Sequence, residues 1–195
     1  MVLKNPDKYQ KGKTIVYFVR HGDRISVSGN KGIGLEPGGP GLSKNGTKQA
    51  KSVAIKFSKI KDEIDVFYSS SMNRALETAM EISKKIKRKP EVYDELSEFN
   101  QILWSKKYYH YKFWKHYKKH KLSLKIFNKI LDKNKGKVIV IVAHGNIIKG
   151  IVGSKLGLSF RQMGNFDYHN CHISRVRFKG RKLDHINYFN SKEMV

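Results

Sequence analysis

Apolar and polar positions along the chain follow two alternating periods, which predicts strands and helices in turn. Short runs rich in apolar and β-branched residues, typical of buried strands, occupy residues 14–19, 65–69, 92–93 and 137–143. Apolar residues recur at helical spacing over residues 43–60, 72–86 and 146–156. Residues 173–178 and 183–189 form a predicted terminal hairpin around Lys179 and Gly180. Strands that alternate with helices predict an α/β fold.

Local signals define the ends of these elements. Ser43 and Ser71 are the predicted N-caps of the first two helices. Residues 29–41 are rich in glycine and proline, which predicts a long loop, and residues 1–13 form a basic lead-in. Residues 101–134 combine lysines with aromatic residues and are predicted to be helical, as a lid or insertion.

Charge is the unusual feature of the composition. The 195-residue chain, long enough for one domain, carries 40 Lys and Arg against 16 Asp and Glu, a formal net charge of +24. Such an excess favours a polyanionic partner or substrate. A compositional bias towards lysine explains it equally well, and the sequence does not decide between the two.

The sequence also carries signals about location. The longest clean apolar run, residues 138–143, is far too short to span a bilayer, and residues 1–13 lack the apolar stretch of a signal peptide. The only cysteine, Cys171, has no partner for an intramolecular disulfide. These observations predict a cytoplasmic protein with no membrane span.

Candidate chemistry lies where two predicted strands end. The strands over residues 14–19 and 137–143 are each followed closely by a His-Gly pair, which contains His21 or His144. Ligands of open α/β sheets bind beyond the carboxyl ends of the strands, so the two histidines are expected to meet there. Arg20 and Arg24 flank the first histidine, and Arg74 lies in the first turn of a helix that follows a strand. Arginines suit phosphate because the guanidinium donates two parallel hydrogen bonds.

The same residues resemble the motifs of the histidine phosphatase superfamily, the phosphoglycerate mutase-like family. The similar segments occur in the family's order: VRHGDR at 19–24, LSKNGTKQA at 42–50, YSSSMNRALETA at 68–79, LSE at 96–98 and VAHGN at 142–146. Each is weak alone, but the ordered set is specific. The resemblance implies a three-layer α/β/α sandwich with a central, mostly parallel sheet and a small helical lid, here a basic aromatic segment at about 99–136 of a single domain spanning 1–195.

The resemblance also implies roles for individual residues. His21 would attack phosphorus and become a phosphohistidine, while His144 assists catalysis. The phosphoryl oxygens would be held by four residues: Arg20, Arg24, Arg74 and His144. Glu98 is the expected proton donor, with Glu95 and Asp23 as alternatives, because the Asp that follows the second histidine in the acid phosphatase branch is replaced here by Gly145.

Neither a metal nor another cofactor is expected for this chemistry. His110, His116 and His120 lie near one another in the sequence, without carboxylates or cysteines between them. They are interpreted as part of a basic face and not as a zinc site.

The function expected from the resemblance is a metal-independent phosphatase that hydrolyses a phosphomonoester. A phosphoglycerate mutase-type phosphotransferase and a polyanion-binding protein on a phosphatase scaffold are the alternatives. The expected partner is a phosphorylated substrate, with a polyanionic one as an option, whereas nucleic acid is not favoured. The lysines at 112, 115, 118 and 119 would recognise further negative charge if the lid binds substrate, whereas Tyr109, Phe113 and Trp114 would pack on the core if the lid is only a cover. The sequence leaves the oligomeric state open.

Overall fold

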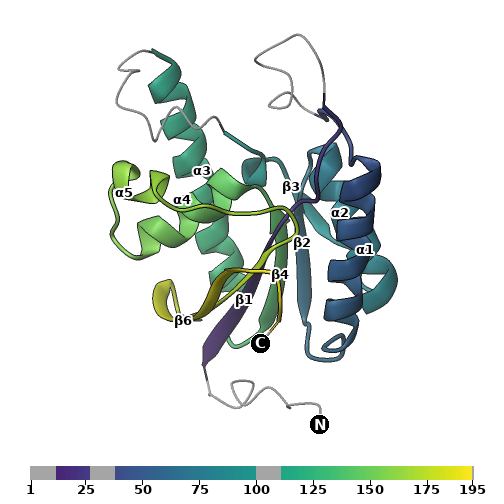
Figure 1. Cartoon of the computed structure of the whole chain (residues 1–195). Coiled ribbons are helices and arrows are strands. Elements are labelled where there is room, and N and C mark those ends of the chain that lie inside the picture. Colours follow the sequence, from purple (N-terminus) through teal and green to yellow (C-terminus); the bar gives the residue numbers. More distant parts are fainter. Residues whose placement is uncertain (1–11, 27–37, 100–110, 195) are drawn as a thin grey trace.

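The computed structural model describes residues 12–26, 38–99 and 111–194. Strands and helices alternate along the chain (Figure 1). The strands are β1 (Lys13–Arg20), β2 (Val66–Ser70), β3 (Glu91–Tyr93), β4 (Val138–Ala143), β5 (Ile173–Lys179) and β6 (Lys182–Ser191). The helices are α1 (Lys44–Ser58), α2 (Asn73–Ile86), the 3₁₀ helix η2 (Asp94–Leu96), α3 (Tyr111–Lys133), α4 (Gly145–Lys155) and α5 (Phe160–Gly164).

The strands form one six-stranded sheet in the order β3-β2-β4-β1-β5-β6. The four strands β3, β2, β4 and β1 are parallel to one another, and β5 and β6 are added antiparallel next to β1. The mostly parallel sheet expected from the sequence is therefore confirmed. Connections between parallel strands cross over through helices, which places helices on both faces of the sheet.

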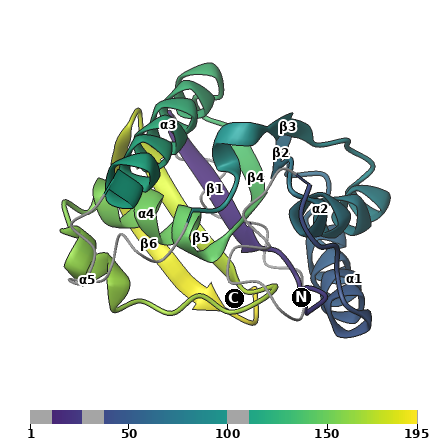
Figure 2. The same cartoon turned by 90° about the horizontal axis from the view of Figure 1, so that it is seen from above.

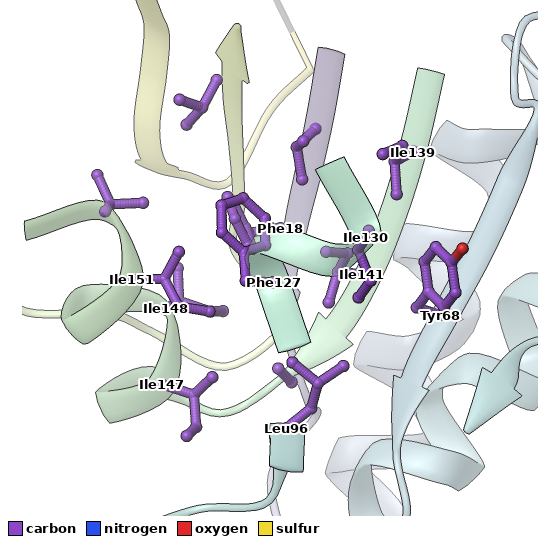
Figure 3. Close-up of a cluster of buried hydrophobic side chains, with 14 of the residues drawn as sticks. Phe18, Tyr68, Leu96, Phe127, Ile130, Ile139, Ile141, Ile147, Ile148 and Ile151 are labelled. Carbon is purple, nitrogen blue, oxygen red and sulfur yellow. The ribbon is translucent and has the colours of Figure 1, made fainter. Parts of the chain in front are cut away.

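Helices cover both faces of the sheet, α3 and α4 on one side and α1 and α2 on the other (Figure 2), and each face buries its own apolar core. On one face α3 and α4 pack with η2 against the strands, and Figure 3 shows Phe127 of α3, Ile148 of α4 and Leu96 of η2 in this cluster. On the other face α1 and α2 cover the alternate residues of the same strands. A strand buried on both sides needs a continuous apolar run, which is why residues 14–19 and 138–143 lack alternation.

The helix starts show where local signals succeed and fail. The predicted cap is confirmed at Ser43, whose Oγ accepts a hydrogen bond from the Gly46 N–H at 2.9 Å. The predicted cap at Ser71 is wrong, because α2 begins after Met72 and has no side-chain cap. Ser71 instead hydrogen-bonds Ser97 across the strand end, with 3.2 Å between the hydroxyl oxygens. Most of the loop predicted at 29–41 and of the lead-in at 1–13 lies outside the described residues.

The segment expected as a lid includes a core helix. Phe127, Ile130 and Leu131 in the second half of α3 are buried against the sheet. The second half of α3 therefore belongs to the core, and the prediction of a lid over 99–136 remains only for the residues before it. Of those, residues 100–110 lie outside the described residues. Trp114 is 62% exposed, so the alternative in which it packs on the core is wrong. Tyr109 and the side chain of Phe113 fall outside what the structure describes.

The interpretation of His120 as part of a basic surface face is also wrong. Its side chain is only 3% exposed and packs edge-on against Phe99 and Phe160. Burial lowers the pKa of His120 to about 4. His116 is half-buried on the same helix, and His110 lies outside the described residues. Within the described ranges, no helix combines the length and apolar character needed to cross a membrane.

Candidate active site

Strand register brings the two histidines together. Arg20 of β1 pairs with Ala143 of β4, so the next residues along the two parallel strands, His21 and His144, emerge side by side. Their ring centroids lie 4.9 Å apart, close to the spacing of neighbouring strands. The meeting of the two His-Gly pairs, expected from the sequence, is confirmed by this geometry.

The His21 ring has one nitrogen available as a nucleophile. Its Nδ1 lies 2.7 Å from the carbonyl oxygen of Gly22, and because a carbonyl only accepts, Nδ1 carries the proton. The other nitrogen, Nε2, then has a lone pair and accepts a hydrogen bond from Arg74 Nε at 3.1 Å. Burial, and next the charge of Arg74, lower the pKa of His21 well below its usual value. The ring is therefore neutral at neutral pH.

Arginines surround this neutral ring. Arg74 is 3% exposed, and its pKa is lowered to about 10, chiefly by burial. Arg20 donates from one terminal nitrogen to the carbonyl of Tyr168, and burial lowers its pKa as well. Arg24 has an exposed side chain beyond the strand end, yet its charge acts on both Arg74 and His21. All three predicted arginines are thus brought to one region, with Arg24 at its rim.

His144 lies at the base of the site. It is fully buried, and its Nε2 lies 2.9 Å from the Ser70 hydroxyl oxygen, at the end of β2. Burial, and next the proximity of His21, keep the pKa of His144 well below its usual value. Among the described residues, three buried nitrogens here have no hydrogen-bond partner: Arg20 Nε, Arg74 Nη1 and His144 Nδ1. Buried polar atoms normally have partners, so these three nitrogens point to a ligand rich in acceptors.

Glu98 is a carboxylate that interacts with this cationic group. Its Oε1 accepts a hydrogen bond from the Phe99 N–H at 3.0 Å, and its charge acts on Arg20 and Arg74. Desolvation raises the pKa of Glu98 to about 7, against the opposing effects of that hydrogen bond and of the arginines. A carboxyl with such a pKa exchanges a proton near neutral pH.

The two alternative donors have different surroundings. Asp23 accepts a hydrogen bond from the Ser43 hydroxyl at 2.7 Å and so helps to fasten the start of α1. Glu95 lies in η2, and its charge acts on the Tyr93 hydroxyl. Of the three carboxylates, Glu98 is the one that acts on both Arg20 and Arg74, which favours it over Glu95 and Asp23 as a proton donor.

The glycines of two motifs explain how the segment that follows His21 is held. A Cβ added to Gly46 would lie 1.9 Å from the Asp23 carbonyl oxygen, and one added to Gly22 would lie 2.6 Å from the Gly46 carbonyl oxygen. The two backbones therefore touch, which only glycine permits. Gln49 and Thr78 accept hydrogen bonds from the N–H groups of Asp23 and Gly22, at 2.8 and 3.0 Å. Side chains of α1 and α2 thus fix the residues after His21.

Sequence reasoning missed several residues that touch the site. Ser70 contacts His144, Asn170 donates to the His21 carbonyl at 2.9 Å, and the Tyr168 carbonyl accepts from Arg20. Asn146 donates from its side chain to the Phe99 carbonyl at 3.0 Å and so fastens the segment that carries Glu98. The only sequence signal for Ser70 and Asn146 was their place inside the family-like motifs. The residues at 168–170 precede an antiparallel strand and carried none.

Metal-binding side chains do not cluster here. Across residues 12–26, 38–99 and 111–194, no group of three or more His, Cys, Asp or Glu side chains converges in a way that could hold a metal ion. The cations of the site, within the same ranges, are the arginines described above and nearby lysines.

Comparison with known proteins agrees with the motifs and the fold. The family model of the histidine phosphatase superfamily (branch 1) matches residues 16–123 and 120–191. No curated protein sequence matches the chain. Among solved structures, a mutant phosphoserine phosphatase from Entamoeba histolytica in complex with phosphoserine aligns with a TM-score of 0.69 and 22% identity over 92% of this chain and 98% of that one. A mycobacterial glucosyl-3-phosphoglycerate phosphatase aligns with a TM-score of 0.74 and 16% identity over 92% and 99% of the two chains.

Proposed function

Because this chain belongs to the histidine phosphatase superfamily, we propose that it is a phosphatase that hydrolyses a phosphomonoester through a phosphohistidine, without a metal ion. The observation that carries the proposal is the fixed tautomer of His21. Its Nδ1 proton is committed to the Gly22 carbonyl, and its Nε2 lone pair is directed to the side where Arg74 lies. Further support comes from structurally similar proteins described as phosphatases of phosphoserine and of glucosyl-3-phosphoglycerate.

In the first step the His21 Nε2 lone pair forms a bond to phosphorus as the bond from phosphorus to the ester oxygen breaks. The incoming phosphoryl group takes over the Arg74 N–H bond that Nε2 otherwise accepts, which frees the lone pair. The unpartnered nitrogens of Arg20, Arg74 and His144 donate to the phosphoryl oxygens as charge redistributes. Arg24 adds positive charge from the rim.

Glu98 carries the proton in both steps. Protonated at first, it gives its proton to the departing alkoxide, so the alcohol leaves neutral. The resulting carboxylate then takes a proton from water as the water oxygen attacks phosphorus and the bond to His21 breaks. Inorganic phosphate leaves, His21 returns to the neutral imidazole, and Glu98 is again protonated. A pKa of about 7 suits a group that must both give and take a proton.

A mutase would use the same phosphohistidine but return the phosphoryl group to an alcohol. The expectation of hydrolysis rests on the small number of residues between Glu98 and β4, since a small lid excludes water poorly. A pure polyanion-binding role would leave the fixed tautomer of His21 and the raised pKa of Glu98 without a use. The cytoplasmic location stays a prediction from the sequence.

The test is hydrolysis of an aryl phosphate by the full chain in excess chelator, with trapping of the phosphoenzyme. We expect activity to persist, and His21→Ala to abolish both turnover and the acid-labile phosphoenzyme. His185→Ala, which changes an exposed histidine on β6, is the matched control and should retain both. Loss of activity on chelation that a divalent ion restores would overturn metal independence. Near wild-type turnover by His21→Ala would overturn the mechanism.

A further inference from the structure

A second cavity lies beside the segment that carries His21. Its volume is about 510 Å³, within the usual range of small-molecule sites, and it lies between α1 and the turn that precedes β5. It is lined by Gln49, Ser52, Val53, Lys56, His169, Asn170, Cys171, His172 and Lys192. None of these residues takes part in the proposed mechanism, so this cavity is separate from the place where the phosphoryl group would bind.

The lining of this cavity is rich in hydrogen-bond donors. Ammonium, amide and hydroxyl groups come from Lys56, Lys192, Gln49, Asn170 and Ser52, and the lining residues include no carboxylate. The Lys56 ammonium is already paired with Glu193, at 2.9 Å from its carboxylate oxygen. Among the described residues, the exposed Lys192 forms no ion pair. Such a lining favours a ligand that carries negative charge and acceptor oxygens.

Two residues of the lining hold the catalytic segment on either side of Gly22. Asn170 donates from its side-chain amide to the His21 carbonyl at 2.9 Å, and Gln49 accepts from the N–H of Asp23 at 2.8 Å. The N–H of Cys171 reaches the same His21 carbonyl at 3.3 Å. In Figure 1 the chain between α5 and β5 runs across the carboxyl end of β1 towards α1. A ligand in the cavity would thus contact the groups that hold the backbone of His21.

The turn that forms one wall of the cavity contains an unfavourable backbone conformation. Cys171 has a φ of 55°, in the left-handed region that residues other than glycine rarely adopt. Such conformations persist only where the surroundings impose them, and they are concentrated at functional sites. Asn190 supports the turn, because its side chain accepts from the His169 N–H at 2.7 Å and its carbonyl oxygen lies 2.8 Å from His172 Nδ1. A ligand that contacts the turn would add to these supports.

The basic segment singled out in the sequence lies elsewhere. Lys115 and Lys118 on α3 have exposed side chains, and Lys119 is half-buried. The side chain of Lys112 falls outside what the structure describes. None of these lysines lines the cavity, so recognition of negative charge by α3 stays a separate prediction.

Building on the phosphatase function proposed above, we propose that this cavity is a regulatory site for a small organic anion. The ligand carries two or more carboxylate or phosphate groups, which pair with Lys192 and accept hydrogen bonds from Asn170 and Ser52. It binds the braced form of the turn more tightly and so shifts the population towards that form. His21 is then held in position for attack in a larger share of the molecules, and kcat rises.

The test compares two anions and two variants of α1. Citrate carries only carboxylates, and methylenediphosphonate carries phosphonate groups joined by carbon, which the proposed reaction does not cleave. Ser52→Trp fills the cavity, whereas Ile55→Trp places the same ring at an exposed position of α1 that does not line it. Thermal unfolding and aryl phosphate hydrolysis are measured for both variants and wild type at constant ionic strength.

Both readouts should respond to the anion in the wild-type protein. At ten times its Kd, the ligand should raise the unfolding temperature by about 3–6 °C. At saturating substrate, kcat should rise about twofold or more. Ile55→Trp should retain both effects and Ser52→Trp should lose both. A response to only one of the two anions supports the site and identifies the group that it binds.

Other outcomes overturn the site without touching the general function. An anion that binds only the catalytic arginines raises KM, leaves kcat unchanged and stabilises the three proteins equally. A Ser52-dependent rise in unfolding temperature without a change in kcat overturns the regulatory role. If the wild-type chain does not hydrolyse the aryl phosphate, the proposed function fails, while the comparison of unfolding temperatures still decides whether the cavity binds anions.

Discussion

Glu98 gives the sharpest prediction because its pKa lies inside the range where activity is measured. With a pKa of about 7, about half of the molecules carry the proton at pH 7, about one in ten at pH 8 and about one in a hundred at pH 9. A glutamate with an ordinary pKa near 4.5 would be protonated in only about one molecule in 300 at pH 7. For an alkyl phosphate, whose poor leaving group requires the proton, kcat/KM, which reports the free enzyme, should therefore decline above pH 7 and approach a tenfold decline per pH unit above about pH 8.

Glu98→Gln keeps the size of the side chain but removes the transferable proton. We expect kcat for an alkyl phosphate to fall by about 10²–10⁴, the usual contribution of general acid catalysis, and the decline above pH 7 to disappear. An aryl phosphate, which leaves without a proton, should lose much less in the first step. The assay is steady-state hydrolysis of both esters by wild type and variant from pH 6 to 9. For each ester, the ratio of the wild-type rate to the variant rate at the same pH cancels the ionisation of the substrate itself. An equal loss for both esters, or a decline above pH 7 that persists in the variant, would refute the assignment.

Two further predictions follow from the buried cations and imidazoles. Arg74→Ala should lower kcat for an aryl phosphate by about 10²–10³, the usual effect of losing one donor to the developing negative charge. Arg88→Ala, which changes an exposed arginine, is the control and should not lower kcat. Comparable rates for the two variants would contradict the role of Arg74. His120 has a pKa of about 4 when folded and about 6.5 when unfolded, so the unfolded chain binds more protons between these values and stability rises with pH there, by up to about 1.4 kcal/mol per pH unit. Urea unfolding at pH 5 and pH 7 should show a smaller gain for His120→Gln than for wild type, and an equal gain would show that His120 does not titrate as described.

The sheet and its functional edge were predictable from the sequence because the signals are local. The apolar runs that became β1 and β4 ended close to their His-Gly pairs, and parallel strands with adjacent ends bring such pairs together. Arg74 was predictable for the same reason, since it follows β2 directly and lies in the first turn of α2. In each case the residue lies next to the end of a strand in the sequence, so the place of that strand in the sheet also determines where the residue lies.

Contacts between distant segments were not predictable in this way. The Tyr168 carbonyl and the Asn170 side chain reach Arg20 and His21 across almost 150 residues, from a segment with no periodic pattern. The burial of His120 depends on packing against Phe99 and Phe160, so the charged residues around it in the sequence suggested a surface helix instead. A helix rich in lysine can still bury one face, and only the packing of α3 shows which residues lie on that face.

The causes of the pKa shifts in the site distinguish what keeps His21 neutral from what the arginines add. Burial is the largest cause of the lowered pKa of His21, and the charge of Arg74 comes second. The neutral state of the nucleophile therefore depends mainly on the packed environment at the strand end, and it persists when one guanidinium is removed. In the proposed mechanism the arginines act chiefly on the phosphoryl group, through donors that the described protein does not otherwise engage. Loss of Arg74 should accordingly lower the rate without moving the pH at which His21 becomes protonated into the neutral range.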